Sequence, residues 1–317
     1  MLRYKNIFVS GTSGYHTFRI PSLIAAKNGD LLAFCEGRRD GNGDSGVIEI
    51  LLRRSQDGGE NWSPIKCVWA NHPNTCGNPC PVLDQTTGMI SLLMTHNLGC
   101  DAESEIIDST SKGTRTVHLT QSVDHGYTWS TPTNITSTTK KEDWTWYATG
   151  PGAGIQLKSG RLIIPCDHIE SISKKYFSHV ILSDDGGSTW YLGGTTPNDQ
   201  VNECEVVELQ NGTLLLNMRN YNRAIRTRAY SYSEDSGLTW SLITHNPDLI
   251  EPICQASMRQ ISVKTDSYLL FSNPANRDNR VRMTVKLSSN DGQTWSHARE
   301  LHSGPAAYSC LHTTDKG

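Results

Sequence analysis

The sequence predicts an all-β protein of the propeller type, and three observations support this prediction. An eight-residue pattern, Ser-x-Asp-x-Gly-x-Thr-Trp, recurs five times along the chain. Short runs of β-forming residues precede the copies, and no stretch shows a long helical period. Equivalent positions of successive copies lie 67, 61, 50 and 55 residues apart. That spacing is about the length of one four-stranded propeller blade with its loops.

Each copy of the pattern predicts a hairpin turn. The Asp and Ser side chains can bond neighbouring backbone amides, Gly accepts a positive φ, and the Trp ring packs beneath the turn. Asn290 takes the Asp position in the last copy. We expect a structural role, and no catalytic one, for the aspartates of the other copies, which are Asp57, Asp124, Asp185 and Asp235.

A β-patterned run before each copy predicts the strand that enters the turn. These runs cover residues 47–52, 116–120, 179–182, 226–232 and 282–287. Each copy should therefore join two strands of one sheet.

Composition limits the classes of function. The chain has 317 residues, enough for one large all-β domain, and a formal net charge of −3. General nucleic-acid binding is disfavoured, because it rests on many phosphate contacts from Lys and Arg. No run approaches the ~18 apolar residues of a membrane-spanning helix.

The cysteines and the N-terminus predict a cytoplasmic location. Nine cysteines give an odd count, and their spacing fits no metal signature. We expect reduced, mostly buried thiols. Residues 1–10 lack the apolar run of a secretory signal.

The repeated pattern resembles the Asp-box repeats of the sialidase family, although the same box occurs in other propellers, including glucan hydrolases and sorting receptors. The segment Phe18-Arg19-Ile20-Pro21 resembles the motif that opens the sialidase catalytic domain. The resemblance runs from about Tyr15 to Tyr308, nearly the whole chain. It implies a single catalytic domain over residues 1–317, folded as a six-bladed β-propeller.

Three arginines occupy contexts similar to the family's substrate clamp. By this resemblance Arg19, Arg219 and Arg280 hold the carboxylate of the substrate, and Arg277 and Arg282 are competing choices for the third position. A guanidinium presents paired donors to a carboxylate, so several guanidinium groups in one pocket select an anionic sugar.

The segment from Glu36 to Asp44 resembles the family's acid/base loop. The resemblance makes Asp44 the general acid/base and puts Arg38 near the C4 side of the sugar, with Asp40 as the competing acid. A Gly-rich loop over a pocket mouth suits a group that must protonate a leaving oxygen and later activate water.

Tyr308, in Pro305-Ala306-Ala307-Tyr308-Ser309, resembles the family's nucleophile motif. Glu203 resembles the partner base, and Glu205 is its alternative. The anomeric carbon of sialic acid carries a carboxylate, which would repel a carboxylate nucleophile. A phenol starts neutral, and a base can take its proton as the new bond forms.

Other segments resemble the family's pocket walls. Asn78, Trp144, Trp146 and Tyr147 are candidates for the rim or the N-acetyl pocket, with a structural role as the alternative. Glu103 or Glu105 is a further candidate. Some animal members have tyrosines soon after the proline matching Pro165, where this sequence has Cys166, Asp167 and His168. The resemblance therefore does not predict which residues contact the glycerol side chain of the sugar.

The end of the chain departs from the family. Further residues usually follow there, completing the last blade and bringing an acidic residue that steadies the first arginine. Residues 315–317 resemble the turn before the next strand, so we expect an incomplete last blade.

The resemblance implies an exo-α-sialidase, a retaining glycoside hydrolase that removes terminal sialic acids from glycoproteins, gangliosides and oligosaccharides. Neither a metal nor an organic cofactor is implied. The alternatives are a trans-sialidase, with a sugar acceptor in place of water, and a non-catalytic sialic-acid-binding propeller.

Overall fold

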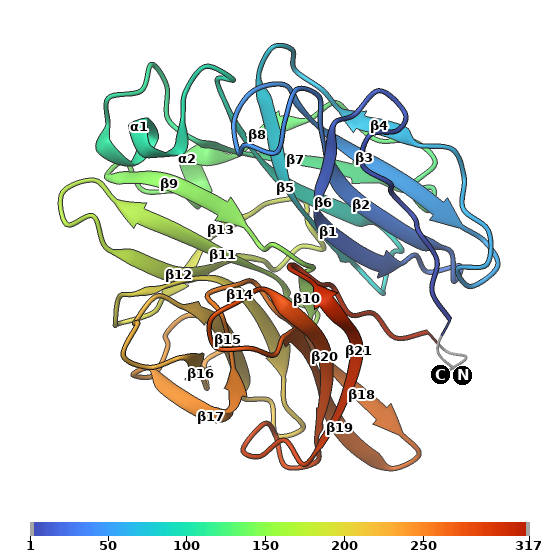
Figure 1. The fold of residues 1–317 in the computed structure, drawn as a ribbon, viewed down its shortest axis with the longest axis vertical. Helices are drawn as coiled ribbons and strands as arrows, with labels where there is room; N and C mark the ends of the chain where they lie inside the picture. The colour runs from blue at the N-terminus through green and yellow to red at the C-terminus, as the bar shows by residue number, and fades with distance from the viewer. Residues whose placement is uncertain (1–2, 315–317) are drawn as a thin grey trace.

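The computed structural model describes residues 3–314, which form five consecutive units of antiparallel strands (Figure 1). The first unit contains β1 (Thr17–Ala25), β2 (Leu31–Arg38), β3 (Ile48–Ser55) and β4 (Lys66–Trp69). The second contains β5 (Thr75–Leu83), β6 (Ile90–Asn97), β7 (Thr116–Ser122) and β8 (Thr133–Asn134). A single parallel pairing, Ile48 with Thr75, joins these two units into one eight-stranded sheet.

The other three units are separate sheets. The third contains β9 (Trp144–Thr149), β10 (Ile155–Gln156), β11 (Leu162–Glu170), β12 (Tyr176–Ser183) and β13 (Tyr191–Thr195), with β9 and β10 both paired to β11. The fourth contains β14 (Val201–Glu208), β15 (Leu214–Asn220), β16 (Thr227–Ser233) and β17 (Thr244–Ile250). The fifth contains β18 (Ser257–Val263), β19 (Asp266–Pro274), β20 (Val281–Ser288) and β21 (His297–Pro305).

The expected all-β class is confirmed. Within the described chain the helices are the short α1 (Glu103–Asp108) and α2 (Thr136–Thr139), and none is long and apolar enough to cross a membrane. Residues 3–314 account for five units, so the count of six blades stays a prediction. The turn expected at residues 315–317 lies outside the described residues.

The hairpin turns form as the sequence predicts. Each repeat connects the last two strands of its unit: β3 to β4, β7 to β8, β12 to β13, β16 to β17 and β20 to β21. In the fourth repeat Ser233 donates to Asp235 at 2.8 Å, and Asp235 accepts from the amide and hydroxyl of Thr239 at 2.8 and 2.6 Å. Gly237, with φ of 89°, closes the turn. These aspartates are structural.

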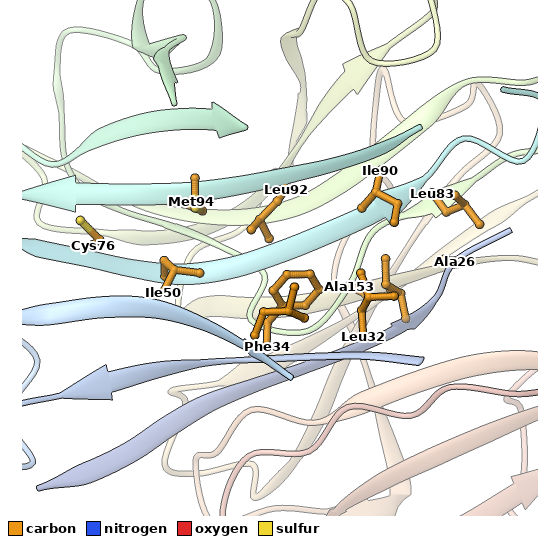
Figure 2. Close-up of a cluster of buried hydrophobic side chains, with 12 residues drawn as sticks. Ala26, Leu32, Phe34, Ile50, Cys76, Leu83, Ile90, Leu92, Met94 and Ala153 are labelled. Atoms are coloured by element: carbon orange, nitrogen blue, oxygen red, sulfur yellow. The ribbon is translucent and has the colours of Figure 1, made fainter. Parts of the chain in front are cut away.

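Apolar clusters fill the spaces between neighbouring units. In Figure 2 Leu32 and Phe34 of β2 face Leu92 and Ile90 of β6, across the gap between the first two units. Three similar clusters join the second unit to the third, the third to the fourth, and the fourth to the fifth. Each sheet therefore buries its faces against its neighbours, as propeller blades do.

The cysteines agree with the expectation of mostly buried thiols. All nine lie in the described chain as free thiols, and only Cys67 and Cys100 among them are exposed.

The repeat geometry predicts a pH-dependent contribution to stability. Burial alone would raise the pKa of Asp235, but hydrogen bonds from Thr239 and Ser233 outweigh it and lower the pKa to about 2. Because this folded-state pKa lies below the ordinary value of 3.8, the stabilisation is present above about pH 4 and is lost as the pH falls through 2. Asp235→Ala should lower the free energy of unfolding by about 1 kcal/mol at neutral pH.

Urea denaturation at neutral pH and at about pH 3 measures this difference. Asp235→Asn is the matched control, since Asn290 fills the same position in the fifth repeat and accepts from Ser288 and Thr294. The Asn variant should be more stable than the Ala variant. A loss in the Ala variant that is the same at both pH values would contradict the assignment.

Candidate active site

A cavity of about 360 Å³ receives side chains from all five units. Five arginines line it: Arg19, Arg38, Arg115, Arg219 and Arg280. Five carboxyl residues line it as well: Glu36, Asp44, Glu103, Asp167 and Glu203. The rings of Trp146, Tyr221 and Tyr308 complete most of the wall. This density of ionisable groups in one concave site is typical of a catalytic or ligand-binding pocket.

Tyr308 belongs to a hydrogen-bonded group of three side chains. Its hydroxyl donates to Oε1 of Glu203, and Nη1 of Arg219 donates to the hydroxyl at 3.2 Å. The same Arg219 nitrogen donates to Oε2 of Glu203 at 2.6 Å. Burial raises the pKa of Tyr308 well above 10, the negative charge of Glu203 adds to the rise, and Arg219 opposes it. The phenol is therefore neutral at neutral pH, with a carboxylate placed to accept its proton.

The structure brings Arg19, Arg219 and Arg280 together around Tyr308. The guanidinium carbons of Arg19 and Arg280 each lie 5.8 Å from the centre of the Tyr308 ring. Arg280 comes from the loop before β20, and its Nη2 donates to the carbonyl of Ile253 at 2.9 Å. Three guanidinium groups thus converge around the Tyr308 side chain.

The competing choices for the third arginine lie elsewhere. Arg282 is exposed and pairs with Glu300 at 2.8 Å, and Arg277 lines a different, small pocket. Neither lines the main cavity.

Asp44 lies on the cavity wall, in the loop between β2 and β3. Its Oδ1 accepts from Arg38 at 2.7 Å and from Arg19 at 3.1 Å. Burial raises the pKa of Asp44, but the charges of Arg38 and Arg19 outweigh it, so the pKa lies below 3.8. Asp40, the alternative acid, is exposed in the same loop and does not line the cavity.

Arg38 is almost fully buried, and its guanidinium nitrogens donate hydrogen bonds to neighbouring groups of the protein. Its Nε and Nη2 donate to Glu36 at 3.0 and 2.6 Å, and its Nη1 donates to the carbonyls of Asn42 and Gly43 at 2.6 and 2.8 Å. Arg38 lines the cavity, and these contacts show that it also fixes the loop that carries Asp44. Its predicted position near the C4 side of the sugar stays a prediction.

Breaks in strand register aim several side chains into the cavity. β1 shifts register between Arg19 and Ser22, β5 between Gly77 and Cys80, and β14 between Val201 and Cys204. The residues inside these breaks include Asn78 and Glu203. Ile20, beside Arg19, has φ of 58°, which is costly for a β-branched residue. β-bulges of this kind redirect side chains next to active sites.

Glu203 and Glu205 lie in the same strand, and the structure separates their roles. Glu205 is fully buried away from the cavity, where it accepts from the amide of Met258 at 2.6 Å and from Ser257 at 2.9 Å. Burial raises its pKa, and Arg259 opposes the rise. Glu205 therefore ties the fourth unit to the fifth, and Glu203 is the carboxylate that contacts Tyr308.

Asn78 lies on the cavity wall, as the sequence predicts, and is held by residues the sequence did not single out. Its Oδ1 accepts from Arg115 and, at 3.0 Å, from Thr95. The guanidinium of Arg115 also stacks 3.8 Å from the centre of the Trp146 ring. Trp146 and Glu103 line the cavity too. Glu105 does not line it and instead accepts from the amide of Ala102, the residue just before α1.

The predicted substrate contacts of Trp144 and Tyr147 are corrected by the structure. Both are buried in the cluster between the second and third units, away from the cavity. Trp144 stacks on His168 with ring centres 3.4 Å apart, and Tyr147 donates to the carbonyl of Thr139 at 3.2 Å. A register shift between β9 and β11 disturbs the alternation of the strand, and Trp146 is the residue that faces the cavity.

Sequence reasoning missed Arg115, Tyr221 and the inward position of Asp167. Arg115 precedes β7 in a segment without a motif. Tyr221 follows Arg219 by two residues, and its ring lies 4.9 Å from the Arg219 guanidinium. Because side chains two residues apart in a strand lie on the same face, the position of Tyr221 beside Arg219 could have been predicted. Within residues 3–314 no cluster of three His, Cys, Asp or Glu side chains is arranged to hold a metal ion.

Comparisons with known proteins identify the family of the chain. A family model described as a BNR repeat-like domain matches residues 29–317. The exo-alpha-sialidase of Arthroderma benhamiae is 31% identical over 92% of this chain and 72% of its own length. The sialidase of Bacteroides fragilis is 31% identical over 97% of this chain and 60% of its own.

A solved structure gives the same result. The Hadza microbial sialidase Hz136 superposes with a TM-score of 0.88 at 31% identity, covering 95% of this chain and 62% of that one. The chain thus spans between 60% and 72% of the length of these three relatives. Because the match extends over nearly the whole chain in both sequence and fold, the chain belongs to the sialidase family of BNR-repeat proteins.

Proposed function

We propose that the protein is an exo-α-sialidase, which hydrolyses terminal sialic acids of glycoproteins, gangliosides and oligosaccharides with retention of configuration. The observation that carries this proposal is the hydrogen-bonded group of Tyr308, Glu203 and Arg219, which shares one cavity with Asp44 and two further arginines. This arrangement supplies a nucleophile, its base, an acid and a clamp for an anion.

Substrate binding uses the three arginines around Tyr308. A carboxylate bound by Arg19, Arg219 and Arg280 lies beside the phenol, because Arg219 Nη1 is 3.2 Å from the Tyr308 hydroxyl. In sialic acid the carboxylate is attached to the anomeric carbon. The clamp therefore brings the anomeric carbon next to the nucleophilic oxygen, and this positioning is a large part of catalysis.

The first chemical step forms a tyrosyl-linked intermediate. The hydroxyl oxygen of Tyr308 attacks the anomeric carbon, its proton passes to Glu203, and the bond to the leaving oxygen breaks as Asp44 protonates that oxygen. The neutral phenol avoids repulsion by the substrate carboxylate. In the second step a water attacks, Asp44 takes its proton, and Glu203 returns a proton to Tyr308. Two inversions at one carbon give retention.

The contact between Arg19 and Asp44 links substrate binding to the acid. In the free protein Arg19 helps to keep the pKa of Asp44 low. A bound carboxylate pairs with Arg19, which weakens the interaction between Arg19 and Asp44, and it also adds a negative charge nearby. Both effects raise the pKa of Asp44. Asp44 thus becomes easier to protonate when a leaving oxygen is present.

Tyr308→Phe should reduce hydrolysis of an aryl sialoside by several orders of magnitude, because the oxygen that attacks the anomeric carbon is gone. Release of the aryl group, followed by fluorescence, measures the rate, and circular dichroism checks the fold. Tyr232→Phe, which changes a tyrosine outside the cavity, is the control and should keep normal turnover. Near-normal turnover of the Tyr308 variant would exclude it as the nucleophile.

Asp44→Ala should slow sialosides with poor leaving groups far more than those with good ones, since only a poor leaving group needs the proton. The comparison is between an aryl sialoside with a weakly basic leaving group and a sialyl-oligosaccharide. Asp40→Ala is the matched control from the same loop. Equal slowing of both substrates in the Asp44 variant would assign Asp44 a structural role only.

A further inference from the structure

Asp167 is a cavity residue that has no role in the proposed mechanism. It lies in β11 and lines the cavity, yet it is only 1% exposed. Its Oδ2 has no hydrogen-bond partner among residues 3–314. An unpaired buried polar atom destabilises the folded protein, so such an atom in a binding cavity calls for an explanation.

The neighbours of Asp167 in the strand face the other way. Cys166 is part of the apolar cluster between the second and third units, and His168 stacks on Trp144. Because side chains alternate between the two faces of β11, Asp167 is the one of these three consecutive residues that points into the cavity. Two nitrogens of Arg115, Nε and Nη1, are likewise buried and unpartnered within the described chain. These unpartnered atoms of Asp167 and Arg115 thus belong to two residues that line the same cavity.

The balance of charges lining the cavity bears on the protonation state of Asp167. Five guanidinium groups and five carboxyl groups line the cavity, so full ionisation would leave no net charge to attract an anionic sugar. Burial raises the pKa of Asp167 well above 3.8, and the charge of Glu203 adds to the rise, while Arg115 and Arg219 oppose it. A neutral Asp167 leaves the cavity with an excess of positive charge and with both a donor and an acceptor on one side chain.

We propose that Asp167 is a specificity-determining residue, whose carboxyl group holds one uncharged hydroxyl group of the bound sialic acid. The proposal rests on the proposed sialidase function. The arginine clamp takes the carboxylate of the sugar, and the remaining polar groups of the sugar include several hydroxyls. A hydroxyl can donate to the unpaired Oδ2 and accept from a protonated carboxyl. A site built in this way discriminates strongly against an analogue that lacks the hydroxyl.

The test uses a set of aryl sialosides that each lack a single hydroxyl group, with the parent compound as reference. In the wild type, removal of the hydroxyl that meets Asp167 should lower kcat/KM by about 10-fold or more. In Asp167→Ala the same removal should have little further effect, because the partner is already gone. The other deoxy compounds should lose equal factors in both proteins.

Asp167→Asn separates the proposed role from a merely structural one. Asn also offers a donor and an acceptor, so it should retain kcat/KM for the parent compound within about 10-fold of the wild type and keep the penalty for the same deoxy compound. Cys166→Ala, on the opposite face of β11, is the control for strand packing and should keep the full wild-type pattern.

The proposal is overturned if Asp167→Ala loses the same factor on every compound, or if Asp167→Asn is as impaired on the parent as the Ala variant. Failure of the proposed function has a different signature: the wild type itself would not release sialic acid from the parent compound, and Tyr308→Phe would change nothing.

Discussion

Apolar packing between the faces of successive sheets is the interaction on which the rest of the structure depends. Each of four buried clusters draws nearly all of its side chains from two adjacent units. Because a sheet can cover its apolar faces only with its neighbours, the units follow one another around a common centre (Figure 1). Arg19 near the start of the chain and Tyr308 near its end come within contact distance as a result.

The features that the residue pattern alone predicts, without the family resemblance, are those encoded locally. The repeat turns depend on side chains within eight residues of one another, so their positions and partners follow from the pattern. The choice between Glu203 and Glu205 did not follow, because alternation predicts that residues two apart share a face. A register shift in β14 removes that equivalence, and register depends on packing against distant strands. The misplacement of Trp144 has the same cause in β9.

The arginines of the cavity differ in whether they form an ion pair with a buried carboxylate. Arg38 and Arg219 form ion pairs with Glu36 and Glu203, which offsets part of the cost of burying their charges. These two guanidinium groups are held in place before any ligand arrives. Arg280 has a backbone carbonyl as its hydrogen-bond partner, and Arg19 shares an exposed carboxylate with Arg38. The last two retain more capacity for an incoming anion, and preorganised charges of this kind contribute strongly to catalysis.

The contact between Arg19 and Asp44 has a consequence for inhibitor design. Under the proposed mechanism, an uncharged sugar mimic has no negative charge for Arg19 to bind, so it binds while Asp44, the proposed acid, stays paired with Arg19 and Arg38. An anionic mimic competes for the same guanidinium and releases the acid to form a hydrogen bond with the compound. Potency in a chemical series should therefore depend on an acidic substituent more steeply than its own salt bridge accounts for, because that substituent also recruits Asp44 as a second point of attachment.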